Sequence, residues 1–336
     1  MDLGIAKTND KFNKEIAKSI SQFLYSNLYK GIFKIIEGKQ VNNTKTTELQ
    51  HAIIQGLVYY RNGAFYSKTG RFNSRIASEL INMGAKYSKF RKAFFIPVNK
   101  ISTEINWAIG TYNARKQAML TSLVTFLTEK YDILDLITPM LKFDHVVNQI
   151  MLDLQKRVYA NARKKKIELI TPKLDTFERE EIARRYTKNL EFWVKDWTAQ
   201  EIVKMRNAVG KMAIEGKTTL EIADYFEKEF GIAKRKALFL ARNENAIATT
   251  SYLVVKYQKE GFEYFKWHTT MDGRQRELHA ELNGKVFSFS NPPIIDTRTQ
   301  QRGYPADVWN CRCAMSPILD SAMVQRRREM YANAHR

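Results

Sequence analysis

Hydrophobic side chains recur every three or four residues along most of the first 260 positions, which is the spacing of amphipathic helices. The first such stretch covers residues 10–37 and is expected to break near Gly31. Further helices are predicted over 47–60, 101–127, 143–169, 218–230 and 233–259, with a helix or a helix pair within 173–215. Thr218 and Glu221 have the spacing of a capping box, and Gly231 is placed to end the helix that they open. Most of the chain is therefore predicted to be helical.

The pattern changes after residue 262. Residues 263–270 are dense in aromatic and β-branched side chains, and residues 285–290 alternate between apolar and polar, so both segments are predicted to be strands. An Asp-Gly turn and a short helix over 276–282 separate them, and 291–307 is expected to be a loop. The predicted fold class is mostly α, with a helical N-terminal region followed by a small α+β C-terminal domain. The expected parts are a helical, basic region (1–215), the α+β domain (216–320) and a basic C-terminal tail (321–336). A short helix is expected to begin at residue 318 and to end in this tail.

The C-terminal part carries an ordered series of short motifs. They are Arg242-x-Glu244, Trp267 near the end of the first strand, Asp272-x-Arg274-x-x-x-x-His279, Asn283-Gly284, Gly303-x-Pro305 and Asn310-Cys311-Arg312-Cys313. Over roughly residues 217–318 this series resembles the C-terminal domain of the phage Mu F-like minor head proteins.

The resemblance implies a non-enzymatic, structural protein of tailed-phage heads. Such a protein is expected to assemble in the host cytoplasm and to lie inside the head of the virion, near the portal vertex. The partners that the resemblance implies are the portal protein, scaffold or major capsid protein, and the genomic DNA.

The chain has a net charge of +20, with 55 Lys and Arg against 35 Asp and Glu. A surface of this sign attracts nucleic acid, anionic membrane or an acidic protein. No apolar run of about 18 residues occurs, so no membrane-spanning helix and no membrane partner are expected. The N-terminus lacks the apolar stretch of a secretory signal.

Between residues 57 and 100, cations alternate with aromatic side chains. Two interpretations stay open. Either the cations follow a DNA backbone while aromatics stack on bases, or the aromatics pack inward and the charges form a solvated face. The residues predicted to contact DNA, without reading its sequence, are Arg61, Lys68, Arg71, Lys89, Arg91, Lys92, Arg163, Lys164, Lys165 and Lys166.

The only two cysteines, Cys311 and Cys313, have one residue between them, a spacing that disfavours a disulfide. The expected absence of a disulfide fits a reducing cytoplasm. Zinc binds four nitrogen or sulfur donors in a tetrahedron. His279 and either His268 or Asp272 complete a candidate zinc site. The alternative is that the thiols are small buried hydrophobes and that His279 is a hydrogen-bonded core residue.

Two other classes of function stay open. One is a metal-dependent nuclease or other effector enzyme, although the segment offers few carboxylates besides Asp272, Glu277 and Glu281 for a hard cation. The other is a dedicated DNA-binding protein. We expect Asp272 to act as the acceptor of its turn, Arg274 or Arg276 to pair with Glu244 or Glu277, and Arg242 with Glu244 to tie the last long helix to the sheet.

Overall fold

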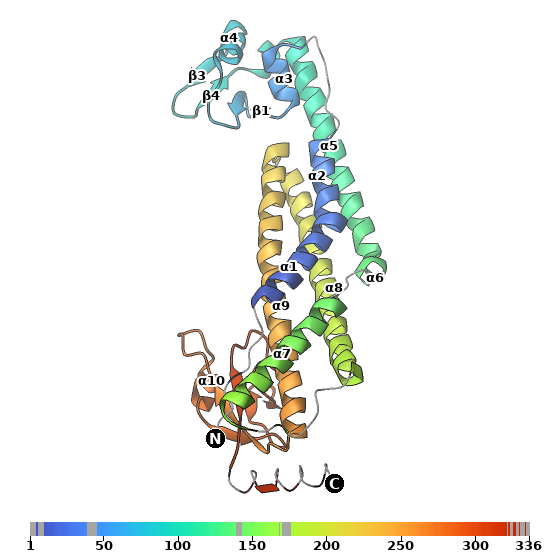
Figure 1. The fold of residues 1–336 in the computed structure, drawn as a ribbon. Coiled ribbons are helices and arrows are strands. Elements are labelled where there is room, and N and C mark those ends of the chain that lie inside the picture. The colour runs from blue at the N-terminus through green and yellow to red at the C-terminus, as the bar shows by residue number, and fades with distance from the viewer. Residues whose placement is uncertain are drawn as a thin grey trace. The chain divides into compact units, whose positions relative to one another are not determined.

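The computed structural model describes residues 5, 10–38, 46–138, 143–167, 169 and 176–320, together with 322, 325, 326, 329 and 333. The predicted tail helix lies mainly outside these residues. Internal contacts divide the chain into two compact units (Figure 1): one consists of 1–23, 138–195 and 233–336, and the other, here called unit 2, of 24–137 and 196–232. The first of these two compact units is called unit 1. The three-part division expected from the sequence stays a prediction.

Helices dominate the described residues, and the strands are short. The helices are α1 (Asp10–Leu24), α2 (Lys30–Glu37), α3 (Glu48–Ile54), α4 (Ser74–Asn82), α5 (Thr103–Asp132), α6 (Leu134–Ile137), α7 (Asp144–Lys164), α8 (Thr176–Ile214), α9 (Thr219–Lys259) and α10 (Glu277–Leu282). The strands are β1 (Val58–Arg61), β2 (Ala64–Ser67), β3 (Lys86–Ser88), β4 (Ala93–Phe95), β5 (Tyr264–His268), β6 (Val286–Ser288), β7 (Ile294–Asp296), β8 (Gln301–Arg302) and β9 (Ala314–Ile318). The mostly α fold class with a small α+β C-terminal part is confirmed. Among the described helices, none has the length and apolar character needed to span a bilayer.

Unit 2 contains a four-stranded antiparallel sheet in the order β1-β2-β4-β3. The prediction of a helix over 47–60 is wrong beyond α3, because Asn62 and Gly63 both adopt positive φ (48° and 77°) and form the tight turn of a β1–β2 hairpin. Phe65 and Phe94 face each other across β2 and β4 and are buried in a core with α3, α4 and α5. Residues 58–95 therefore depart from the helical N-terminal region predicted from the sequence.

The expected break near Gly31 is replaced by a π-helical turn at Tyr25–Tyr29, after which α2 continues through Gly31. A Cβ at residue 31 would overlap the ring of Phe126 on α5. The glycine therefore allows α2 and α5 to approach closely, and it does not break the helix.

Helix α9 runs without interruption from Thr219 to Lys259, so the predicted stop at Gly231 is wrong. The buried stripe continues past the glycine through Phe226, Ala233 and Ala237, and this apolar face outweighs the weak helix propensity of glycine. The predicted capping box is confirmed: the backbone N–H of Glu221 donates to Thr218 Oγ1 (3.2 Å), and the backbone N–H of Thr218 donates to Glu221 Oε2 (2.8 Å).

Unit 1 contains the antiparallel sheet β6-β5-β9, with α10 in the connection from β5 to β6. The predicted strands at 263–270 and 285–290 and the short helix between them are confirmed. Two features were not predicted: the third strand, β9, and the small β7–β8 hairpin inside the segment 291–307 that was expected to be loop. Side chains alternate along β5, so that Phe265 and Trp267 are buried on one face.

Candidate functional site

Three metal-ligating side chains converge in unit 1. His279 comes from α10, whereas Cys311 and Cys313 come from the segment that leads into β9. The Sγ atoms of Cys311 and Cys313 each lie 3.5 Å from His279 Nδ1, and the three ligand atoms lie within 4.8 Å of one another. We call these residues the Cys/His cluster. Both cysteines are free, and Cys311 and His279 are buried.

Contacts on the far side of the imidazole fix the orientation of His279. Its Nε2 donates to the backbone carbonyl of Ile295 on β7 (3.2 Å), which leaves Nδ1 as the nitrogen that faces the sulfurs. The ring packs edge-on against the buried Trp267, with the ring centroids 5.5 Å apart. Thr269 Oγ1 donates to the carbonyl of His279 (2.5 Å), so strand β5 and helix α10 are tied together beside the cluster.

The two sulfurs differ in their electrostatic environment. A hydrogen bond from the Cys311 thiol, with contacts to His279 and Thr269, lowers the pKa of Cys313 to about 4 although burial opposes ionisation. The same contact with Cys313, together with burial, raises the pKa of Cys311. Backbone N–H groups of Ala306 (3.3 Å) and Cys313 (3.5 Å) both donate to Cys311 Sγ. The Cys313 thiol is therefore the more readily ionised of the two.

The two alternative fourth ligands lie outside the cluster. His268 points to the opposite face of β5 from Trp267, because side chains alternate along a strand, and its Nε2 is 2.6 Å from Ser316 Oγ on β9. The carboxylate of Asp272 is held by Arg274 (2.9 Å) and by Arg312, whose guanidinium NH2 lies 2.9 Å from Asp272 Oδ1. The structure thus brings together His279, Cys311 and Cys313 but neither His268 nor Asp272.

The arginine pairing differs from the expected one. Asp272 accepts from the backbone N–H of Arg274 (3.2 Å), as predicted for its turn. Arg276, however, donates to the carbonyl of Trp309 (2.8 Å), and Arg242 lies nearest to Asp10, with Nε 3.7 Å from Oδ1. The predicted pairs with Glu244 are therefore wrong.

Glu244 is fully buried, and its Oε1 atom accepts a hydrogen bond from the side-chain amide of Asn243 (3.1 Å). Burial raises the pKa of its carboxyl group. The neighbouring Asn243 also accepts from the backbone N–H of Asn310 (2.7 Å). Helix α9 therefore binds the chain at the residue directly before Cys311.

The remaining motif residues shape the backbone around the cluster. Asn283 Oδ1 accepts from the backbone N–H of Thr269 (2.9 Å), and the backbone N–H of Gly284 donates to the carbonyl of Trp267 (2.8 Å). Pro305 is buried in the turn that presents the N–H of Ala306 to Cys311. These motif residues therefore surround the Cys/His cluster.

Comparison with known proteins agrees with this series. Residues 203–316 match the model of the family described as Phage Mu protein F like protein. This part of the chain is therefore similar to the Mu F-like family.

Three curated proteins each resemble part of the chain. An uncharacterized protein of Haemophilus influenzae is 28% identical over 38% of this chain and 27% of its own length. The putative capsid assembly protein F of Escherichia phage Mu is 24% identical over 52% of this chain and 36% of its own length. An NAD(+)--arginine ADP-ribosyltransferase, EFV, of Enterococcus faecalis is 28% identical over 44% of this chain and 31% of its own length. The chain thus spans about a quarter to a third of these relatives, and no solved structure matches it.

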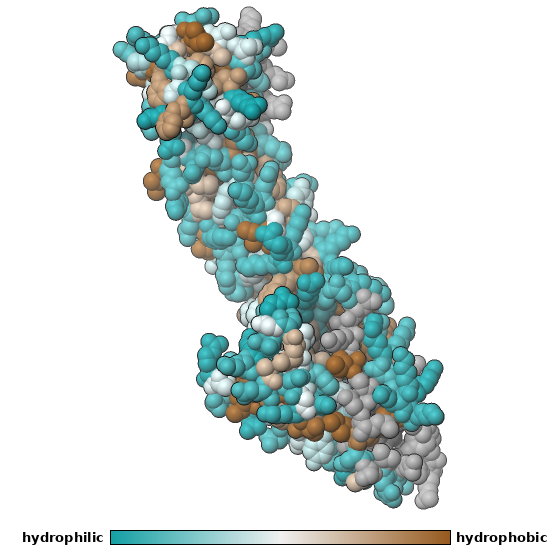
Figure 2. Space-filling model, turned by 90° about the vertical axis from the view of Figure 1, so that its left-hand side faces the viewer, coloured by the Kyte–Doolittle hydropathy of each residue, from teal (hydrophilic) through white to brown (hydrophobic). Residues whose placement is uncertain are grey.

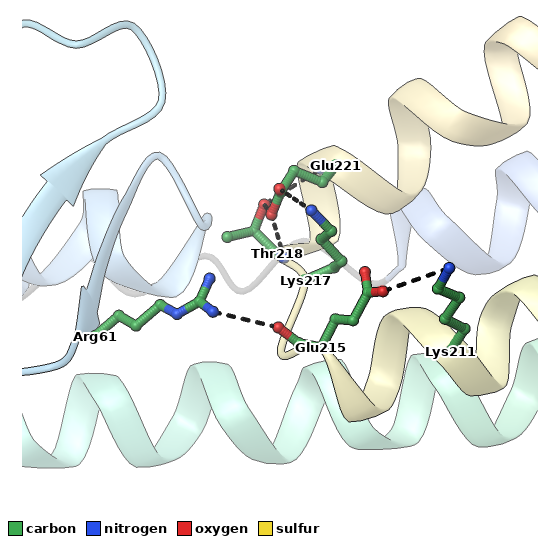
Figure 3. A network of polar contacts seen from close by, with 6 residues as sticks. All are labelled: Arg61, Lys211, Glu215, Lys217, Thr218 and Glu221. Carbon is green, nitrogen blue, oxygen red and sulfur yellow. Dashed lines mark hydrogen bonds and ion pairs between the residues drawn. The ribbon is translucent and has the colours of Figure 1, made fainter.

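Two residues of the predicted DNA-contacting set have internal partners in unit 2. Figure 3 shows Arg61 at the end of β1 reaching the turn between α8 and α9, where it donates to the carbonyl of Glu215 (3.5 Å) beside the Thr218 capping box. Lys68 lies 3.8 Å from the carboxylate of Asp224 on α9. Both cations therefore connect the four-stranded sheet to the start of the Mu F-like segment, which reduces their availability to DNA.

The other predicted cations are exposed. Lys89, Arg91 and Lys92 lie in the β3–β4 turn, which also carries Phe90, a side chain 95% exposed to solvent. Arg71 is exposed after β2. Arg163, Lys164, Lys165 and Lys166 are exposed at the end of α7, where cations also favour the helix dipole. Figure 2 shows hydrophilic residues over most of one face of the molecule, with hydrophobic ones in scattered patches.

Backbone groups and one hydroxyl complete the Cys/His cluster, and sequence reasoning did not find them. They are the carbonyl of Ile295, the N–H of Ala306 and the hydroxyl of Thr269. Every residue has a backbone N–H or C=O, so residue type gives no signal for the first two. Thr269 lies within the predicted strand 263–270, and its position beside Cys313 Sγ (3.6 Å) arises only from the folded sheet.

Proposed function

We propose that this chain is a minor head protein of a tailed bacteriophage that joins the head near the portal vertex, assists head assembly and DNA packaging, and contacts the genome. The match of residues 203–316 to the Mu F-like family carries the proposal. The similarity to a putative capsid assembly protein of phage Mu supports it. The motif residues of this segment form one connected structure around the Cys/His cluster, as expected if the segment is a building block for assembly.

Genome contact is proposed for strand β3 and the β3–β4 turn of unit 2, residues 86–92. Lys86, Lys89, Arg91 and Lys92 are exposed there, and no described carboxylate lies within ion-pair distance of any of them. Such cations can replace the counterions of DNA phosphates without first breaking an internal ion pair. Phe90 at the tip adds an apolar surface that can pack against a sugar or a base. The contact would position DNA without reading its sequence.

The head assignment is tested by deleting the gene in the phage or prophage that carries it and by mass spectrometry of purified particles. We expect the chain in wild-type heads at far lower copy number than the major capsid protein, and few DNA-filled heads in the deletion. Full heads of normal yield that lack the chain would contradict the assignment.

The DNA contact is tested by the salt dependence of binding to a duplex of mixed sequence. Replacing Lys89, Arg91 and Lys92 by Ser should reduce the slope of log K against log salt by about 0.9 for each phosphate contact removed. The matched control replaces three exposed cations that have carboxylate partners, Lys14, Arg75 and Lys211, and changes the net charge equally. Equal losses in both variants would mean that overall charge, and not the β3–β4 turn, determines binding.

A further inference from the structure

The two sulfur–nitrogen distances in the Cys/His cluster are those of a tetrahedral metal site. Zinc lies about 2.3 Å from sulfur and about 2.0–2.1 Å from imidazole nitrogen, so a tetrahedral angle places the two donors about 3.6 Å apart. Both Sγ–Nδ1 distances in the structure are 3.5 Å. The sulfurs of Cys311 and Cys313 are thus equally far from one nitrogen. Because that nitrogen has a single lone pair, it can accept a hydrogen bond from only one of the two thiols.

The surroundings of the three donors are those of metal ligands. Nε2 of His279 donates to the carbonyl of Ile295, and a ligating histidine characteristically donates its other ring N–H to a carbonyl or a carboxylate. Two backbone N–H groups, of Ala306 and Cys313, donate to Cys311 Sγ and so partly offset the effect of burial on this sulfur. Thiolate with imidazole is a donor set that selects zinc over the hard cations magnesium and calcium.

We propose that His279, Cys311 and Cys313 bind one zinc ion through Nδ1 and the two Sγ atoms. The ion would link α10 to the segment that leads into β9. Its ligands His279 and Cys311 are 32 residues apart in the chain. It would therefore hold the cysteine segment on the β6-β5-β9 sheet. The proposal does not depend on the function in the phage head.

Within the described part of the chain, no fourth histidine, cysteine or carboxylate joins the cluster. His268 and Asp272 are held by Ser316 and by arginines, respectively. The cysteines line an open cavity of about 600 Å³, together with Arg242 and Arg312. Water can reach the metal from this cavity, so the fourth coordination position is expected to hold an exchangeable ligand, as in zinc sites with three protein ligands.

The first test measures the zinc content of the full-length chain, purified under reducing conditions without chelator and reconstituted with zinc. One zinc per chain is expected for the wild type and for His268→Asn, whereas Cys313→Ser should lose it. Because His268 and Cys313 are both partly buried residues of the same sheet region, the first variant is a matched control. Retention of zinc by Cys313→Ser, or its loss in His268→Asn alone, would overturn the assignment of the ligands.

The second test uses the wild type alone, so it does not depend on the folding of a variant. Cobalt(II) should give visible bands of a tetrahedral ion and a near-ultraviolet thiolate-to-cobalt band, and zinc should displace it. Added imidazole should shift the visible bands by entering the fourth position. Absence of the thiolate band would overturn the metal site, and visible bands unchanged by imidazole would overturn the open position.

Discussion

The end of α9 contains a buried ion pair whose removal tests how unit 1 is held together. Lys256 Nζ and Glu260 Oε1 are 2.9 Å apart, one helical turn from each other, and both side chains are 0% exposed. The ammonium group also lies 5.2 Å from the centre of the Tyr159 ring on α7. The pair therefore lies where α9 packs on α7 and leads into β5.

Replacing only Lys256 by Met leaves the carboxylate of Glu260 in a site without solvent. Removal of one partner of a buried pair costs about 3–5 kcal/mol, because the remaining charge stays buried without that counter-charge. At about 2–4 °C per kcal/mol for a unit of this size, the melting temperature should fall by roughly 6–20 °C. Glu260→Leu should have a similar effect for the same reason.

The double variant Lys256→Met/Glu260→Leu removes both charges and keeps the volume. It should be far more stable than the sum of the two single changes predicts, because replacing a whole buried pair by apolar residues is often neutral or stabilising. Urea unfolding followed by circular dichroism gives the four free energies of this cycle. Strictly additive losses, or single changes that cost less than about 1 kcal/mol, would refute the reasoning.

Further predictions concern the helix cap, the sheets and the basic turn. Thr218→Ala removes the capping hydrogen bond and should lower the free energy of unfolding by about 1 kcal/mol in urea titrations. Burial is the largest influence on Glu221, but its hydrogen bonds with Thr218 and Lys217 together outweigh it and hold its pKa below the ordinary 4.5. The stability that Glu221 contributes is thus present above pH 4.5 and lost as the pH falls through the lowered pKa. Glu221→Gln should therefore have a lower urea midpoint than the wild type at pH 7 and an equal one in acid; a constant gap would contradict this. Trp267→Ala empties a fully buried site and should cost about 3–5 kcal/mol, which a small shift in the urea midpoint would exclude. Phe90→Ser should change stability by less than about 0.5 kcal/mol yet weaken DNA binding in a titration of duplex fluorescence anisotropy, and unchanged binding would count against the proposed role of the tip.

Periodicity predicted the long helices well, because each buries one apolar stripe that the sequence shows directly. It failed where a local signal opposed tertiary packing. Gly231 has the position of a helix stop, yet the apolar stripe of α9 continues past it. Conversely, the segment 58–61 continues a helical pattern, yet the turn at Asn62 and Gly63 makes it a strand. The strand β9 contains Pro317, a residue type that disfavours strands. Proline is tolerated here because β9 is an edge strand of the β6-β5-β9 sheet.

The candidate site was predictable in its members but not in its geometry. His279, Cys311 and Cys313 were chosen because their side chains are good metal ligands, and the fold places them together. His268 was included for the same reason, but alternation along β5 turns it to the other face. Arg61 and Lys68 illustrate the same limit for charge. A cation in the sequence does not reveal whether a carbonyl or a carboxylate of the same chain already binds it.

Direct binding to the portal protein of the same phage tests most directly the proposal that the chain is a portal-associated head protein. The purified chain should retain the portal protein in a pull-down at low and at high salt, and after nuclease treatment, because the interaction is proposed to be between proteins. Binding that disappears with nuclease or high salt would show that the charge of +20 and bound nucleic acid cause the association. That result would contradict the portal assignment and favour a DNA-binding protein.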